Sequence, residues 1–190
     1  MSIAEEATLE VHQLLNDMNL PYAIIGGAAV QVWAEPRFTQ DLDLTVLAPI
    51  EFFSETIEQL LSRLEPRIDN ARDFAQRSRV LLLQTSTGYP VDISFGLPGY
   101  EEEVISRSVE VELTPGKGVR FCSPEDLIIH KSIAGRVQDM IDIQNVIVRQ
   151  KGRLDLTYTR FWLKAFGDLL ETSEVLDRFE DAWRQYGPES

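Results

Sequence analysis

The sequence has 190 residues and a net charge of −13, and 44% of its residues are hydrophobic. This length suits one domain or a small α/β core with a helical appendage, and the hydrophobic content excludes a disordered chain. No apolar run reaches the ~20 residues that span a bilayer, and the single cysteine, Cys122, excludes an intramolecular disulfide and a Cys-rich zinc site.

The distribution of charge along the sequence bears on the location and the partners of the protein. The N-terminus is acidic and lacks the basic start and apolar stretch of a signal peptide, so a cytoplasmic protein without a membrane partner is expected. Non-specific nucleic-acid binding neutralises phosphates with Lys and Arg, and the excess of acidic residues makes that class of function less expected. The same charge is compatible with divalent cations.

Hydrophobic periodicity predicts an α/β part over residues 1–122. Apolar residues at helical spacing indicate helices, and short apolar runs bounded by turn residues indicate strands. In chain order the predicted segments are a helix over 3–18, a strand over 22–25, a helix over 28–34, a strand over 42–47, a helix over 50–64, strands over 80–83 and 91–95, and a strand pair over 109–113 and 119–121. Residues 65–78 are predicted to form an irregular, charged connection.

From Ser123 onward the pattern is helical to the end of the chain. Ser123 is a plausible N-cap, Pro124 fits the first helical position, and Asp126 lies where a capping acid can reach back. Three or four helices are expected, near 124–134, 138–150, 157–170 and 173–185. We therefore predict two parts, an α/β core over 1–122 and a helical part over 123–190 that packs on it.

Three aspartates form the strongest chemical signal. Asp41 and Asp43 alternate with leucines, and residues two apart on a strand point to the same face. Asp92 repeats this alternation on a later strand. Carboxylates so close together repel, and Mg²⁺, which prefers oxygen ligands, resolves the repulsion. If the two strands are neighbours, the trio suits metal-assisted in-line displacement. An Asp-x-Asp pattern on its own is more often a solvated face of a strand.

A glycine pair precedes the second predicted helix. Gly26 and Gly27 follow an apolar strand, and glycine allows either a positive φ or close approach of a phosphate to backbone N–H groups at a helix start. A lone Gly-Gly is usually a turn. The ordered set of strand, glycine pair, helix, Asp-x-Asp and a later acid is what favours a functional site.

The same ordered set resembles the DNA polymerase β-like nucleotidyltransferase superfamily. Three segments are similar to a bacterial subgroup of minimal nucleotidyltransferases that includes AbiEii/MenT-type toxins: Gly-Gly-Ala-Ala-Val (26–30), Arg-Phe-Thr-Gln-Asp-Leu-Asp-Leu (37–44) and Ser-Pro-Glu-Asp-Leu-Ile-Ile-His-Lys (123–131). The resemblance covers residues ~20–150. It implies an α+β fold with a mixed sheet flanked by helices and an all-helical C-terminal part.

The resemblance also implies roles for individual residues. Asp41 and Asp43 would bind magnesium, with Mn²⁺ as the alternative, and Asp92 would be the third carboxylate of both the metal site and the catalytic set. Gly27 would contact the nucleotide phosphates, and Gly26 would shape the turn. Further nucleotide-binding candidates are Arg37, Thr39 and Lys131.

Two of these candidates have a competing structural interpretation. Arg37 would equally well pair with a nearby acid. Lys131 and Arg136 precede Asp139 and Asp142, which lie three apart and share a helix face. A cation there would hold a triphosphate, or the four residues would form an interhelix salt-bridge network that joins the helical part to the α/β part.

The predicted function is Mg²⁺-dependent transfer of a nucleoside monophosphate from an NTP to an acceptor hydroxyl or phosphate, with release of pyrophosphate. The acceptor is left open between a small molecule, a protein side chain and a tRNA end. Two alternatives remain: a toxin with the same chemistry that is held by an antitoxin protein, and a non-catalytic nucleotide-binding module.

Overall fold

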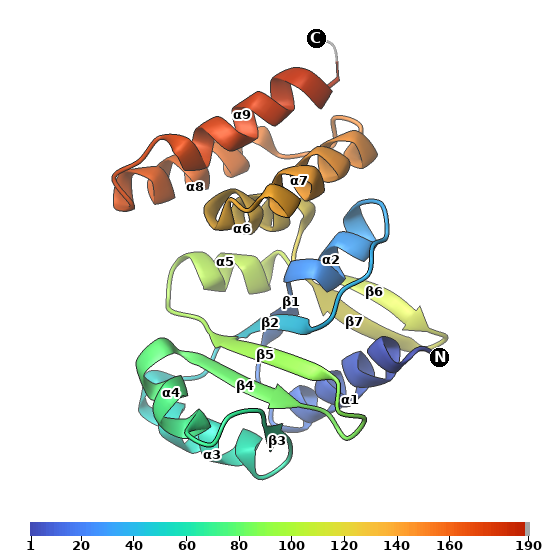
Figure 1. Ribbon diagram of the computed structural model, residues 1–190, viewed down its shortest axis with the longest axis vertical. Helices are drawn as coiled ribbons and strands as arrows, with labels where there is room; N and C mark the ends of the chain where they lie inside the picture. The colour runs from blue at the N-terminus through green and yellow to red at the C-terminus, as the bar shows by residue number, and fades with distance from the viewer. Residues whose placement is uncertain (189–190) are drawn as a thin grey trace. The chain divides into compact units, whose positions relative to one another are not determined.

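The computed structural model describes residues 1–188, and the chain divides into two compact units (Figure 1). The first unit comprises residues 1–28 and 38–122, and the second comprises 29–37 together with the chain from residue 123. Helix α2 (Gly26–Trp33) therefore begins in the first unit and ends in the second.

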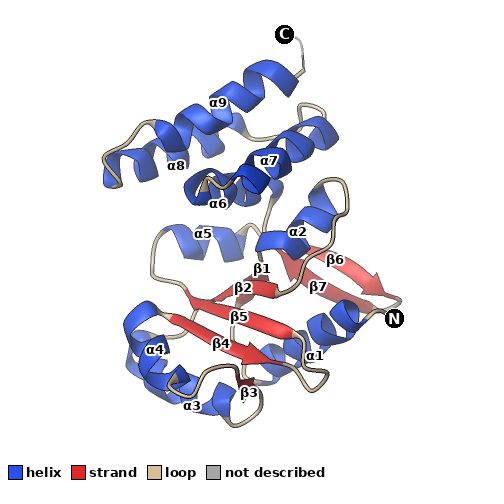
Figure 2. Ribbon diagram, viewed as in Figure 1, coloured by secondary structure: helices blue, strands red, loops and turns tan. Residues whose placement is uncertain are grey.

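A seven-stranded sheet forms the centre of the first unit, in the order β3-β4-β5-β2-β1-β7-β6 (Figure 2). The strands are β1 (Tyr22–Ile24), β2 (Leu42–Val46), β3 (Glu65–Pro66), β4 (Val80–Gln84), β5 (Pro90–Phe95), β6 (Val109–Thr114) and β7 (Lys117–Phe121). Strand β2 runs parallel to β5 and β1 runs parallel to β7, whereas the other neighbours are antiparallel. The predicted mixed sheet is confirmed.

One face of the sheet is buried throughout its central strands. Leu42, Leu44, Leu81, Val91 and Ile93 are each at most 1% exposed, and they alternate with less buried residues on the same strands. Because successive strand side chains point to opposite faces, this alternation leaves Asp43 and Asp92 on the opposite face. The apolar residues that form the core thus also fix where the carboxylates point.

Five helical segments complete the first unit: α1 (Ile3–Asp17), η1 (Ile50–Phe52), α3 (Phe53–Leu61), α4 (Ala71–Ser78) and α5 (Tyr100–Ser106). Helix α1 begins at a capping box, in which the Ser2 hydroxyl accepts from the Glu5 N–H and the Glu5 carboxylate accepts from the Ser2 N–H.

The predicted irregular connection over 65–78 is wrong. The segment contains strand β3 and the two-turn helix α4. Its helical signal is weak because the buried positions, Ala71 and Ala75, are small residues among charged ones. The helix ends at Arg79, whose φ of 58° lies in the left-handed region, where a non-glycine residue is uncommon.

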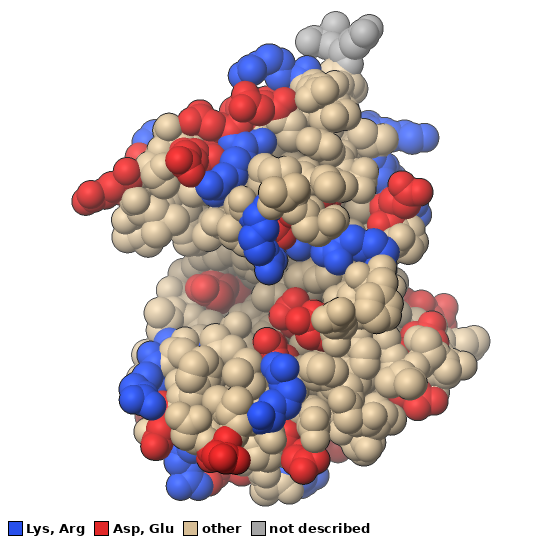
Figure 3. Space-filling view, in the orientation of Figure 1, with Lys and Arg blue, Asp and Glu red and all other residues tan. Residues whose placement is uncertain are grey.

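Four helices make up most of the second unit: α6 (Pro124–Ala134), α7 (Val137–Gln150), α8 (Leu156–Leu169) and α9 (Glu174–Tyr186). Helix α6 begins as predicted, with the Ser123 hydroxyl accepting from the Asp126 N–H and Pro124 in the first turn. Acidic and basic side chains are interspersed over the face of this unit drawn in Figure 3. Within residues 1–188, no helix has both the length and the apolar character needed to cross a membrane.

Candidate active site

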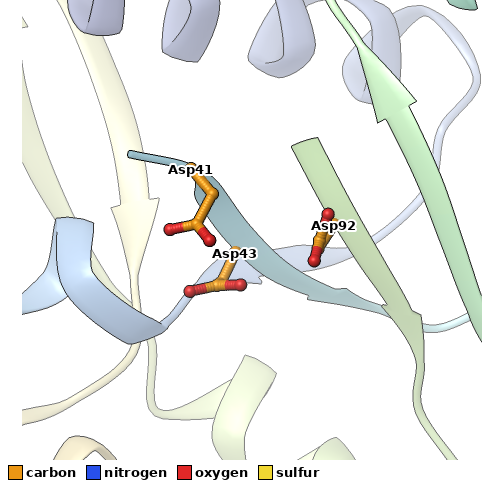
Figure 4. Close-up of side chains that lie close together, drawn as sticks. All are labelled: Asp41, Asp43 and Asp92. Atoms are coloured by element: carbon orange, nitrogen blue, oxygen red, sulfur yellow. The ribbon is translucent and has the colours of Figure 1, made fainter. Parts of the chain in front are cut away.

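Three partly buried carboxylates converge on one face of the sheet. Asp41 directly precedes β2, Asp43 lies within it, and Asp92 lies on β5. The parallel pairing of β2 and β5 places Asp43 directly opposite Asp92. Each aspartate offers one carboxylate oxygen, and these oxygens all lie within 4.8 Å of one another (Figure 4). The sheet register therefore joins two acidic segments that are far apart in the chain.

The electrostatics of the trio favour a bound cation. Partial burial raises the pKa of Asp92, the Arg67 guanidinium lowers it, and the nearby Asp41 carboxylate raises it again. The net effect is a pKa above the usual range for aspartate. All three side chains are only partly buried, which leaves room for further oxygen ligands. An all-oxygen set with this spacing fits Mg²⁺, which accepts one or two carboxylates together with water and phosphate.

Gly26 occupies the junction between β1 and α2 in a conformation that favours glycine. Its φ is +63°, in the left-handed region. A Cβ atom built there would lie 2.0 Å from Oδ2 of Asp43. The glycine therefore lets the start of α2 lie directly against a carboxylate of the trio. The positive φ and the close approach of Asp43 would each disfavour a side chain at this position.

Replacing Gly26 with alanine is expected to cost about 1–3 kcal/mol of unfolding free energy and to displace the Asp43 carboxylate. We expect metal-dependent nucleotide binding, measured by calorimetry, to weaken by at least about tenfold. Gly88→Ala is the matched control, because Gly88 has a φ of +76° but nothing within 4 Å of its Cβ position. Equal losses of nucleotide binding in the two variants would show that the contact with Asp43 is unimportant.

Two side chains hold the segment that leads to Asp41. The Thr39 hydroxyl donates to the carbonyl oxygen of Asp41 at 3.2 Å and lies 3.3 Å from its Oδ1. The Tyr89 hydroxyl donates to the Thr39 carbonyl oxygen at 3.2 Å. Burial raises the pKa of Tyr89, and the charges of Asp41 and Asp43 raise it further, so the phenol stays protonated and remains a donor. In this structure Thr39 positions a carboxylate of the trio.

Arg37 and Lys131, both predicted to bind nucleotide, lie in an ion-pair network of the second unit. The Lys131 ammonium lies 2.9 Å from Oδ1 of Asp139 and 2.8 Å from Oδ2 of Asp142. Arg37 donates to both carboxylate oxygens of Asp142, at 2.9 and 2.8 Å, and Arg136 donates to Asp139. The side chains of Lys131 and both aspartates are at most 5% exposed. These residues therefore form a salt-bridge network within the second unit, and their role in nucleotide binding stays a prediction.

Sequence reasoning missed two residues near the trio. Arg67 follows β3 and forms an ion pair with Asp92, and Tyr89 supports Thr39. Arg67 belongs to the segment that was expected to be irregular, so nothing placed it near the sheet. Tyr89 lies in the turn between β4 and β5, and nothing in the sequence of that turn indicates its hydrogen bond to Thr39.

The mixed sheet, the helical unit and the convergent acidic trio fit the nucleotidyltransferase class of proteins. This chain belongs to the family described as nucleotidyltransferase of unknown function (DUF6036), whose sequence model matches residues 1–189.

Solved structures of other nucleotidyltransferases have a similar fold. The antibiotic-resistance factor ANT(2″)-Ia, in complex with adenylyl-2″-tobramycin, aligns with a TM-score of 0.55 and 17% identity over 89% of this chain and 99% of that chain. An antigenic nucleotidyltransferase-like protein from Paracoccidioides brasiliensis aligns with a TM-score of 0.53 and 16% identity over 93% and 91% of the two chains. A comparison with curated protein sequences finds no match.

Proposed function

We propose that this protein transfers a nucleoside monophosphate from an NTP to an acceptor hydroxyl or phosphate, with Mg²⁺ or Mn²⁺ held by Asp41, Asp43 and Asp92. The observation that carries the proposal is the approach of three carboxylate oxygens to within 4.8 Å of one another, on one face of the sheet and beside the start of α2. Membership of a nucleotidyltransferase family supports the same reaction class.

The proposed chemistry is an in-line displacement at the α-phosphorus. The acceptor oxygen forms a bond to the α-phosphorus, the bond from that phosphorus to the oxygen bridging to the β-phosphate breaks, and its electron pair leaves with pyrophosphate. Asp92 accepts the proton of an acceptor hydroxyl, a role that suits a carboxylate whose pKa is raised by burial. The divalent cation supplies charge neutralisation at the phosphates when it is bound.

Backbone groups at the start of α2 would bind the phosphates. The first N–H groups of a helix have no partner within the helix and lie at its positive end. Gly26 and Gly27 occupy the first two positions of α2, and Gly26 lies against Asp43. The proposed nucleotide therefore has its phosphates beside these N–H groups and next to the carboxylate trio. Thr39 contributes by holding Asp41.

The acceptor remains a choice between a small molecule, a protein side chain and a tRNA end. The excess of acidic residues favours the first two, because a polynucleotide is bound mainly through cationic side chains. The ANT(2″)-Ia structure, which contains adenylyl-2″-tobramycin, is a precedent on this fold for a small hydroxyl acceptor. Membership of the AbiEii/MenT-type subgroup, a toxin role and an antitoxin partner stay predictions.

In the test, the purified protein is incubated with each α-³²P-labelled NTP, Mg²⁺ and a cell extract. The small molecules, RNA and protein of the mixture are then separated. We expect label from at least one NTP to enter one of these fractions, and EDTA to prevent this. If none of the four NTPs gives EDTA-sensitive label above that of the extract alone, while ATP still binds, the protein is a nucleotide-binding module instead.

A further inference from the structure

Arg67 lies at the end of a row of residues that crosses the sheet and includes two of the proposed metal ligands. The register pairs Asp43 with Asp92 across β2 and β5, and Asp92 with Leu82 across β5 and β4. The next residue in the row is Arg67, whose backbone N–H donates to the Leu82 carbonyl oxygen at 3.0 Å. Residues paired in this way project from the same face of a sheet. The Arg67 side chain therefore lies on the same face as the carboxylates.

The Arg67 guanidinium uses this position to pair with the trio. Its Nη2 donates to Oδ1 of Asp92, and the two side chains are each 29% exposed. Its positive charge lowers the pKa of Asp92, opposing the effects of burial and of Asp41. The contact thus partly neutralises a cluster of three carboxylates in which each lies close to the others.

A divalent cation at the trio would compete with this arrangement. Arg67 and the cation would share one carboxylate, and two positive charges so close together repel. The arginine side chain is long and partly exposed to solvent, so its guanidinium can leave Asp92 while the backbone stays in the sheet. The cation cannot occupy a different place, because its ligands are the converging oxygens.

We propose that Arg67 is an exchangeable counter-ion of this active site. It pairs with Asp92 in the metal-free protein and moves away when a divalent cation takes that carboxylate. Arg67 is thus a positioning residue that stabilises the empty acidic cluster and sets the metal concentration at which the site fills. This inference rests on the proposed metal site.

The test compares Mn²⁺ binding by wild-type protein and Arg67→Met, titrated calorimetrically in the absence of nucleotide. Removing the competing charge is expected to tighten Mn²⁺ binding by about 3- to 10-fold. In EDTA the variant is expected to melt at a lower temperature than the wild type, and saturating Mn²⁺ is expected to reduce this difference. Arg67→Gln, which keeps a polar side chain, provides the same comparison if Arg67→Met does not fold.

Arg72→Met is the matched control. Arg72 follows Arg67 by five positions, pairs with Glu58 and lies away from the trio, so this variant makes the same change in net charge. Mn²⁺ affinity that is unchanged or weaker in Arg67→Met, or that rises equally in Arg72→Met, would overturn the exchange. If the wild type shows no Mn²⁺ binding that depends on Asp41 and Asp43, the proposed metal site itself fails, and this inference fails with it.

Discussion

Replacing Asp41 and Asp43 together with asparagine is expected to abolish Mg²⁺-dependent nucleotide binding and to lower nucleotidyl transfer by at least about 10³-fold. Asparagine keeps the size of the side chain but removes the negative charge that attracts the cation. Asp92 would remain as a single carboxylate, and one carboxylate is a weak Mg²⁺ site. Calorimetric titration with a non-hydrolysable NTP, with Mg²⁺ and with EDTA, measures the loss of binding.

The metal-free stability of the same variant separates a functional role from a structural one. Asp43 is paired in register with Asp92 across the parallel strands β2 and β5, and two negative charges this close repel. In EDTA the variant should therefore be as stable as the wild type or slightly more stable. Asp69→Asn with Asp73→Asn removes the same charge from exposed positions and should alter neither binding nor transfer. A loss of several kcal/mol in the metal-free Asp41/Asp43 variant would show that these carboxylates support the fold instead.

The parts of the site that the sequence predicts are those encoded by neighbouring residues. The alternation of Asp41 and Asp43 with leucines fixes a common face without any knowledge of the sheet, because the strand period is two. The position of Gly26 between a strand and a helix likewise predicts a special turn. Predicting that Asp92 joins the other two carboxylates required the further assumption that its strand lies next to β2. The observed pairing of β2 with β5 confirms that assumption.

The parts that could not be predicted depend on long-range register or on weak local signals. Arg67 reaches Asp92 only because β3, β4 and β5 are adjacent, and β3 is two residues long. Helix α4 was missed because alanines give little hydrophobic contrast. Arg37 and Asp142 are 105 positions apart, so their pairing, and the grouping of residues 29–37 with the helical unit, has no local signature.

Replacing Lys131 with methionine is expected to lower the free energy of unfolding by about 3–5 kcal/mol at neutral pH, because two buried carboxylates lose the cation they share. Lys164→Met is the control. Lys164 and Asp168 form an exposed i,i+4 pair on α8, and its loss should cost about 0.5 kcal/mol or less. Denaturant unfolding of the two variants measures the difference.

The pH dependence of this loss follows from the two aspartates. Burial alone would raise the pKa of Asp142, but hydrogen bonds from Arg37 and Lys131 outweigh this effect, so the pKa lies below its usual value. The pKa of Asp139 is lowered in the same way by hydrogen bonds from Arg136 and Lys131. A carboxylate with a lowered folded-state pKa contributes stability above its unfolded pKa of about 4, and loses it as the pH falls through the folded value. Without Lys131 the two carboxylates keep only Arg37 and Arg136 as cationic partners, so they protonate more easily, and protonation relieves the excess buried negative charge. The difference in stability between wild type and Lys131→Met should therefore be largest at neutral pH and shrink as the pH falls toward 4.

A partial rescue completes the test of Lys131. Adding Asp142→Asn to Lys131→Met removes one of the two buried carboxylates that lose Lys131, so the double variant should regain part of the lost stability even though Arg37 also loses its charged partner. The same proteins, titrated with nucleotide, decide between the two roles considered for this lysine. A Lys131→Met protein of wild-type stability that no longer binds NTP would assign the ammonium to the triphosphate, whereas a large, pH-dependent and rescuable loss of stability assigns it to the buried network.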